Sequence, residues 1–138
     1  MERKVAISIG AIAGLVVGAT LVALYGLPPA GPTSSTQQVR FTVVMSHQGF
    51  NGSLAMPPPW PVLSVQHGET VTIHLKNEDP VEAHGFGITH YLAGGVTIRP
   101  GETYRFSFLA DENGTFKVYC NIFCTVHVYM QNGQLVVA

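Results

Sequence analysis

"ETVTIHLK", residues 69–76, alternates between apolar and polar side chains with a period of two. In an extended strand, Val71, Ile73 and Leu75 point to one side, and the polar residues between them point to the other. A strand of this kind covers a core with one face and meets solvent with the other, which is typical of an antiparallel sheet. The stretch therefore predicts a β-strand in a layered, all-β fold.

Other segments after residue 38 show the same pattern and are separated by turn-forming residues. The further predicted strands are Val39–Met45, Ala83–Ile88, Gly95–Ile98, Thr103–Ala110, Thr115–Cys120 and Gln134–Val137. Turns are predicted at NEDP (77–80), RPGE (99–102) and DENG (111–114). Residues 52–62, "GSLAMPPPWPV", are expected to be irregular, because proline has no N–H for a sheet ladder. About seven short strands without helical periodicity predict an antiparallel β-sandwich or barrel.

The N-terminal part has a different composition, with no charged residue from Val5 to Leu27. A helix of this length, at about 1.5 Å per residue, spans roughly 34 Å and can cross a hydrocarbon core of about 30 Å. A signal peptide usually has a shorter apolar region, about 7–15 residues, and ends at a small-residue cleavage site. No good site of that kind is present, so we predict an uncleaved, single-pass membrane anchor over residues 1–27.

The flanks of this run predict how the chain is arranged at the membrane. Two cationic residues, Arg3 and Lys4, precede it and predict a cytoplasmic N-terminus, which places the remainder outside the cell membrane. Residues 28–38 are rich in Pro, Ser and Thr and predict a tether. The exported domain is expected to cover residues 39–138. Small residues on one face of the anchor helix would permit a partner helix to approach: Gly10, Gly14 and Gly18.

Charge and chemistry restrict the class of function. The net charge is −1 and charged residues make up 11% of the chain, which excludes the basic surface that nucleic-acid binding requires. The chain shows no acid–base pair or nucleophile arrangement of its own. We therefore expect a carrier and not a catalyst.

"CNIFCTVHVYM", residues 120–130, holds both cysteines of the chain in a loop between two predicted strands. A disulfide between Cys120 and Cys124 would enclose only three residues and leave His127 and Met130 without a role. A structural zinc site usually has a second pair of ligands, and thioether is a poor zinc ligand. Copper fits the residue types best, because thiolate and thioether suit Cu(I) and imidazole suits both oxidation states.

A second histidine ligand is needed, and His84 is the best placed. It begins a predicted strand after a turn, and Gly85 follows it, which permits close approach of the backbone. His90 is the reserve ligand. The remaining histidines are predicted to face solvent: His47, His67 and His74.

The segments "AHGFGI", "RPGETYRFSF", "GTFKVYCNIFC" and "GQLVV" resemble the cupredoxin superfamily. More narrowly, they resemble the copper-A domain of cytochrome c oxidase subunit II, which nitrous oxide reductase shares. The likeness covers residues 39–138, and the anchor before it is similar to the short, one-helix subunit II of some archaeal and thermophilic oxidases. The resemblance implies a Greek-key β-sandwich and a binuclear copper centre that takes electrons from cytochrome c or a blue copper protein.

The resemblance also implies a ligand set, with the two cysteines as bridging thiolates and Met130 as the thioether ligand. The residues that match the family's ligands are His84, Cys120, the backbone carbonyl of Ile122, Cys124, His127 and Met130.

One departure from the family concerns spacing, because the usual pattern is Cys-x3-Cys-x3-His-x2-Met. Here only two residues separate Cys124 from His127. Val128 and Gln131 would occupy the usual ligand positions if the backbone did not compensate. The spacing from Cys124 to Met130 is also similar to a mononuclear blue copper loop. We favour the binuclear centre, since both cysteines stand at family spacing, and the mononuclear site stays open.

The expected function is electron transfer from an external donor to a terminal oxidase or similar reductase, with an oxidase subunit as a possible partner for the glycine face. The rival functions are an exported copper chaperone or storage module and a metal-free sandwich with a disulfide. An acidic run (Glu78, Asp79 and Glu82) is either a docking site for a basic donor or a solvated turn. Apolar loop residues are expected to keep water from the metal: Ile122, Phe123, Val126, Val128 and Tyr129.

Overall fold

The computed structural model describes residues 37–138. The predicted anchor at residues 1–27, its glycine face and nearly all of the predicted tether lie outside the described residues. Within residues 37–138, no helix combines the length and the apolar character that spanning a membrane requires.

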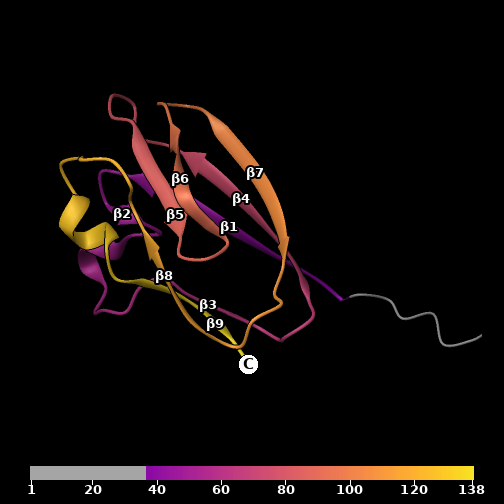
Figure 1. Ribbon diagram of the computed structural model, residues 1–138. Coiled ribbons are helices and arrows are strands. Elements are labelled where there is room, and N and C mark those ends of the chain that lie inside the picture. The colour runs from indigo at the N-terminus through magenta and orange to yellow at the C-terminus, as the bar shows by residue number, and fades with distance from the viewer. Residues whose placement is uncertain (1–36) are drawn as a thin grey trace, which may run out of the picture. The chain divides into compact units, whose positions relative to one another are not determined.

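The described residues form nine strands in two sheets, with two short 3-10 helices (Figure 1). The first sheet has the order β2-β1-β4-β7 and the second the order β3-β9-β8-β5-β6. In the first sheet the strands are β1 (Gln38–Ser46), β2 (Gly49–Phe50), β4 (Thr70–Asn77) and β7 (Thr103–Leu109). In the second they are β3 (Val62–Val65), β5 (His84–Ile88), β6 (Leu92–Ile98), β8 (Gly114–Tyr119) and β9 (Gly133–Val137). The helices are η1 (Ser53–Ala55) and η2 (His127–Met130).

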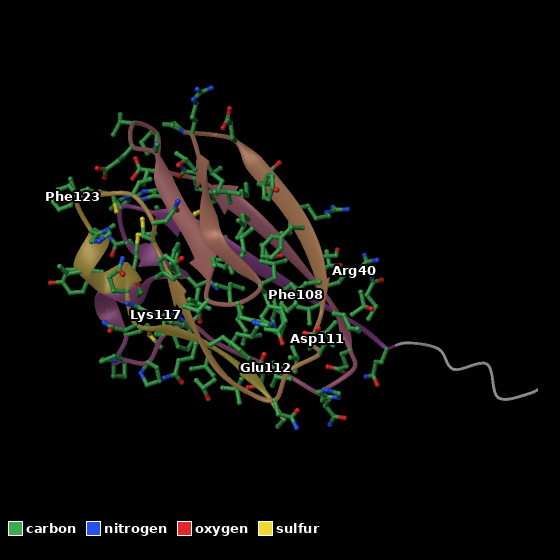
Figure 2. The ribbon with its side chains drawn as sticks, viewed as in Figure 1. Arg40, Phe108, Asp111, Glu112, Lys117 and Phe123 are labelled. Carbon is green, nitrogen blue, oxygen red and sulfur yellow. The ribbon has the colours of Figure 1, made fainter. Side chains whose placement is uncertain are left out.

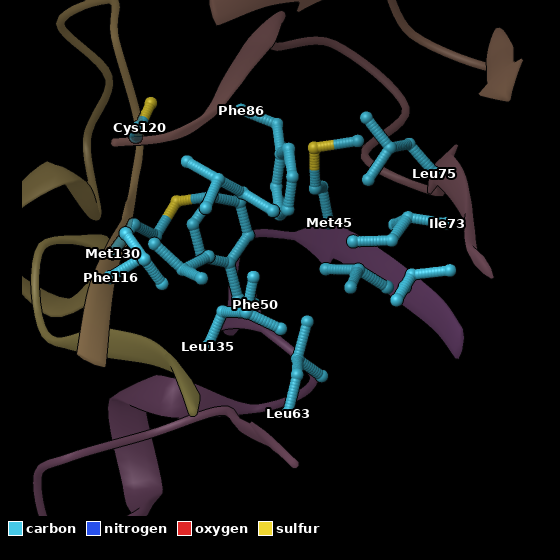
Figure 3. Close-up of a cluster of buried hydrophobic side chains, with 14 of the residues drawn as sticks. Met45, Phe50, Leu63, Ile73, Leu75, Phe86, Phe116, Cys120, Met130 and Leu135 are labelled. Carbon is cyan, nitrogen blue, oxygen red and sulfur yellow. The ribbon is translucent and has the colours of Figure 1, made fainter. Parts of the chain in front are cut away.

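The core lies between the two sheets and is built from the inward side chains of alternating strands (Figure 3). In β4, Val71, Ile73 and Leu75 are fully buried, which confirms the pattern read from residues 69–76. Phe50 of the first sheet packs edge-on against Phe86 of the second, with ring centroids 5.5 Å apart. Such aromatic contacts tie the two layers together beyond the burial of apolar surface.

The predicted all-β sandwich is confirmed, but its strands are not all antiparallel. β1 pairs with β4 in parallel, and β3 pairs with β9 in parallel. The reason is that the chain crosses into the second sheet at β3 before β4 returns to the first, so β4 runs alongside β1 in the same direction. Two short strands, β2 and β3, were not predicted, and β6 begins three residues before the predicted start at Gly95.

The proline-rich segment is irregular, as expected, but it is anchored. The backbone N–H of Trp60 donates to the Asn132 carbonyl at 3.2 Å, and that of Gln134 donates to the Pro61 carbonyl at 2.8 Å. The Trp60 indole N–H donates to the Asn51 carbonyl at 3.0 Å. The two backbone bonds fix the segment against the residues that follow η2, and the indole bond fixes it against the residue that follows β2.

Replacing Ile73 by Ala should lower the free energy of unfolding by about 2–5 kcal/mol, because it leaves a cavity between the sheets. Replacing its neighbour His74, which is only half-buried on the opposite face of β4, should change stability by less than about 0.5 kcal/mol. Urea denaturation of the apoprotein measures both. Equal losses for the two variants would contradict the assigned faces of β4.

Candidate metal centre

The predicted copper ligands of the C-terminal segment lie on the connection between β8 and β9. Cys120 directly follows β8, and His127 and Met130 begin and end η2. Phe123 marks the tip of this connection, at one end of the domain (Figure 2). We call residues 120–132 the ligand loop. It leaves one strand and returns to its antiparallel neighbour, so both of its ends are held by the second sheet.

The structure brings four side chains of the ligand loop together. The sulfur atoms of Cys120 and Cys124 are 3.8 Å apart, and Cys124 Sγ is 3.7 Å from Met130 Sδ. A ring nitrogen of His127 lies within 4.8 Å of both cysteine sulfurs. Both cysteines and Met130 are buried. The loop therefore forms a compact group of soft donor atoms at the edge of the core.

The backbone carbonyl of Ile122 belongs to the same group. It lies 3.0 Å from Cys120 Sγ and 2.8 Å from His127 Nδ1. A carbonyl between a thiol and an imidazole accepts hydrogen bonds from both when no cation is present, and it is an additional oxygen donor when one is.

The shortened spacing between Cys124 and His127 does not displace His127 and Met130 from the cysteines. The single turn of η2 brings His127 and Met130 to the cysteines, whereas the Val128 side chain is 66% exposed. Gln131 donates a hydrogen bond to the Cys120 carbonyl at 2.9 Å, and its amide nitrogen lies 3.2 Å from His127 Nε2. The helical turn of η2 therefore compensates for the missing residue between Cys124 and His127, which the sequence alone could not decide.

His84 approaches from β5, and its two ring nitrogens have different surroundings. The ring is fully buried, and Nε2 lies 3.0 Å from the Asp79 carboxylate. Burial alone would raise the pKa of Asp79, but hydrogen bonds from the backbone N–H groups of Val81 and Glu82, and from His84, outweigh it and lower that pKa. An ionised Asp79 accepts a hydrogen bond from Nε2–H, which keeps the proton on Nε2 and leaves the lone pair on Nδ1.

His84 Nδ1 has no hydrogen-bond partner, although it is buried. A buried acceptor without a partner costs about 1–3 kcal/mol, so such atoms are rare unless a ligand satisfies them. The neighbouring N–H of Gly85 donates to Cys120 Sγ at 3.3 Å, which places this part of β5 against the ligand loop. A free imidazole nitrogen beside a group of sulfur donors fits a copper ion.

The glycine at position 85 is required by this approach. A Cβ atom there would lie 2.8 Å from the backbone nitrogen of Asn121 and 2.9 Å from that of Ile122. Backbone atoms cannot move aside as a flexible side chain can. The absence of a side chain lets β5 lie directly against the start of the ligand loop.

Both cysteines are free thiols in the described structure. Burial, together with the neighbouring Cys120 thiol, raises the pKa of Cys124 to about 12. The thiol is therefore protonated at neutral pH until a cation displaces the proton. One metal ion with bonds of about 2.3 Å to both sulfurs needs them within about 4.6 Å of each other, and their separation of 3.8 Å meets that condition.

The other histidines lie outside this group. His90, the reserve ligand, contacts the carboxylates of Asp111 and Glu112 at 3.7 and 3.5 Å. Figure 2 shows these two acidic residues at the end of the domain opposite Phe123. His47 and His67 are exposed, as predicted, and His74 is half-buried.

The acidic run does not form a free docking surface. Asp79 is buried against His84, Glu78 pairs with Lys76 at 2.6 Å, and Glu82 accepts hydrogen bonds from Thr125. Sequence reasoning therefore missed the structural roles of Asp79 and Glu82. The one available signal was a carboxylate in a turn shortly before His84, the predicted ligand. Turns that are exposed to solvent show the same pattern, so it did not reveal the buried role of Asp79.

The apolar residues of the ligand loop are divided between core and surface. Val126 is buried, but Phe123 is 91% exposed and Tyr129 is 45% exposed. The exposed side chains of Phe123, Val128 and Tyr129 therefore do not enclose the donor atoms as expected, and we call these three residues the exposed apolar surface of the ligand loop.

Comparison with known proteins gives a family match over most of the chain. Residues 16–137 match the model of the cupredoxin-like domain. Among curated proteins, the nitrous-oxide reductase of Ralstonia nicotianae is 38% identical over 77 residues, which cover 54% of this chain and 12% of that protein. The chain thus spans only a small part of this relative's length.

Solved structures share the fold. The copper-containing nitrite reductase (NirK) of Thermus scotoductus is similar over 72% of this chain and 27% of its own, with 29% identity and a TM-score of 0.55. A chain of a heme-copper terminal oxidase dimer is similar over 94% of this chain and 97% of its own, with 17% identity and a TM-score of 0.55. At that identity the second likeness shows the fold alone.

Binding of Cu(I) to the apoprotein should become tighter as the pH rises from 7 to 9, because each thiol must lose a proton and the pKa of Cys124 lies above this range. The deprotonation of Cys124 should make the apparent dissociation constant fall about tenfold per pH unit. Competition with a chromophoric chelator measures it. The Cys124→Ser variant is the control and should show a smaller slope, whereas a pH-independent affinity would contradict thiolate binding.

Proposed function

The chain belongs to the family of cupredoxin-like domains, and from that premise we propose that it is a membrane-anchored electron carrier with a binuclear copper-A-type centre. Electrons would enter from an external donor protein and pass to a terminal oxidase or a similar reductase. The sequence similarity to a nitrous-oxide reductase supports a copper-A-type domain, because that enzyme class shares this domain with oxidase subunit II.

The observation that carries the proposal is the number of donor atoms around the paired cysteines. Five candidate donors gather in the ligand loop, and His84 of β5 adjoins them through the contact of Gly85 with Cys120, whereas a single copper ion usually takes three or four donors. The donors are His84 Nδ1, Cys120 Sγ, the Ile122 carbonyl, Cys124 Sγ, His127 and Met130 Sδ. Two ions that share both thiolates would use all six.

The surroundings of these donors fit a carrier better than a copper chaperone or store. Copper, when bound, supplies a one-electron change between two oxidation states. The protein's part is to hold its ligands still, so that little rearrangement accompanies that change. Cys120, Cys124 and Met130 are buried, and Asp79 fixes the proton and the orientation of His84. A chaperone would need exposed ligands that release the ion readily.

The exposed apolar surface of the ligand loop supports a docking site for the donor. Phe123 lies beside His127, with ring centroids 5.6 Å apart, so the half-buried ring of this candidate ligand is in contact with that surface. An electron would thus have a short path from a docked donor to the centre. The family resemblance suggests cytochrome c or a blue copper protein as that donor.

The copper-loaded protein should contain two coppers per chain and show the purple absorption and valence-delocalised EPR signal of a binuclear centre. Replacing Cys124 by Ser should remove that signal and lower the copper content to one or none. Optical and EPR spectra with metal analysis measure this. A single copper with a strong blue or red band, retained in the Cys124→Ser variant, would favour the mononuclear alternative instead.

The predicted anchor has its own test. Full-length protein should stay with the membrane fraction after alkaline carbonate washing, because roughly 20 apolar residues suffice to span a bilayer. A variant that lacks residues 1–27 should be recovered in the supernatant. Release of the full-length protein by the wash would refute membrane anchoring and leave the copper centre unaffected.

A further inference from the structure

The connection between β4 and β5, residues 78–83, contacts the ligand loop through one carboxylate. Glu82 accepts two hydrogen bonds from Thr125: the backbone N–H donates to Oε1 at 3.0 Å, and the hydroxyl donates to Oε2 at 2.6 Å. Hydrogen bonds to an ionised carboxylate are stronger than bonds between neutral groups. Both oxygens of Glu82 are thus committed to a single residue of the loop.

Thr125 stands where the loop is one residue shorter than in the family that the chain resembles. Thr125 and Val126 are the whole connection between Cys124 and His127. Thr125 is exposed, whereas Cys124 and Val126 on either side of it are buried. Among the described residues, Glu82 is the hydrogen-bond partner of Thr125 itself, and the turn around Thr125 is closed by the His127 N–H, which donates to the Cys124 carbonyl at 3.1 Å.

Glu82 is itself held rigidly from the core. Its backbone N–H donates to Asp79 Oδ1 at 3.0 Å, and its carbonyl accepts a hydrogen bond from the buried Asn77 side chain at 2.9 Å. The other oxygen of Asp79 faces His84 Nε2. A single connection therefore fixes His84 through Asp79 and the Cys124–His127 segment through Glu82.

We propose that Glu82 is a positioning residue that clamps Thr125 and so fixes Cys124 and His127 relative to His84. The consequence for metal binding rests on the proposed function: the clamp keeps the shortened loop in the conformation that can hold two coppers. The consequence for the loop itself requires no metal. These two consequences can be measured separately.

The metal-free test is amide hydrogen exchange of the full-length apoprotein, followed residue by residue. The Glu82→Ala variant should exchange the amides of Thr125 and His127 at least tenfold faster than the wild type. The matched control is Glu78→Ala, which removes the same charge from the same connection but breaks only the exposed pair with Lys76. It should leave these rates unchanged. Equal rates in all three proteins would overturn the clamp.

Three conservative variants separate hydrogen bonding from charge. Glu82→Gln keeps an acceptor for the Thr125 N–H and should retain slow exchange. Thr125→Val loses only the hydroxyl bond and should show an intermediate rate, while Thr125→Ser should behave like the wild type. Fast exchange in Glu82→Gln, as fast as in Glu82→Ala, would show that charge alone acts and would overturn the proposed hydrogen-bond clamp.

The copper test uses the same variants. Glu82→Ala should lose half or more of its bound copper, together with the delocalised EPR signal, whereas Glu78→Ala should keep both. If the wild type itself binds a single copper or none, the proposed function fails, and the exchange experiment still decides the clamp. Unchanged copper content and spectra in a variant with fast exchange would overturn the role of Glu82 in forming the centre.

Discussion

The close approach of β5 to the end of β8 is the constraint on which the candidate centre depends. Gly85 leaves room for the backbone of Asn121 and Ile122, and its N–H meets the Cys120 sulfur. Because β5 is fully buried, this contact also fixes where His84 enters the site. Without this contact, the strand that carries His84 would not lie against the loop that carries the cysteines.

Sequence reasoning predicted the elements that follow from local patterns. The alternation of Val71, Ile73 and Leu75 gave the correct inner face of β4, and the residue types of the ligand loop identified side chains that the structure brings together. Their binding of copper stays a prediction. The parallel pairs were not predictable in this way, because strand direction depends on where the chain crosses between sheets.

The supporting residues were missed for a related reason. Asp79 and Glu82 stand in a turn with Pro80, where carboxylates are usually solvated. Their roles depend on partners far along the chain, such as Thr125, which no local pattern reveals. The short spacing between Cys124 and His127 could not be interpreted from the sequence for the same reason. The turn of η2 that compensates for it is known only from the three-dimensional structure.

The antiparallel pairing of β8 with β9 has a consequence for how this centre can diversify. The last pair of the β8–β9 ladder joins Val118 to Gly133 at the base of the ligand loop. This pairing holds both ends of the loop and does not depend on the residues between them. Five of the six donors come from that one loop, and only His84 is supplied by the scaffold. Insertions, deletions or whole loop exchanges between these anchor points can therefore alter the set of candidate donors while the sandwich stays the same.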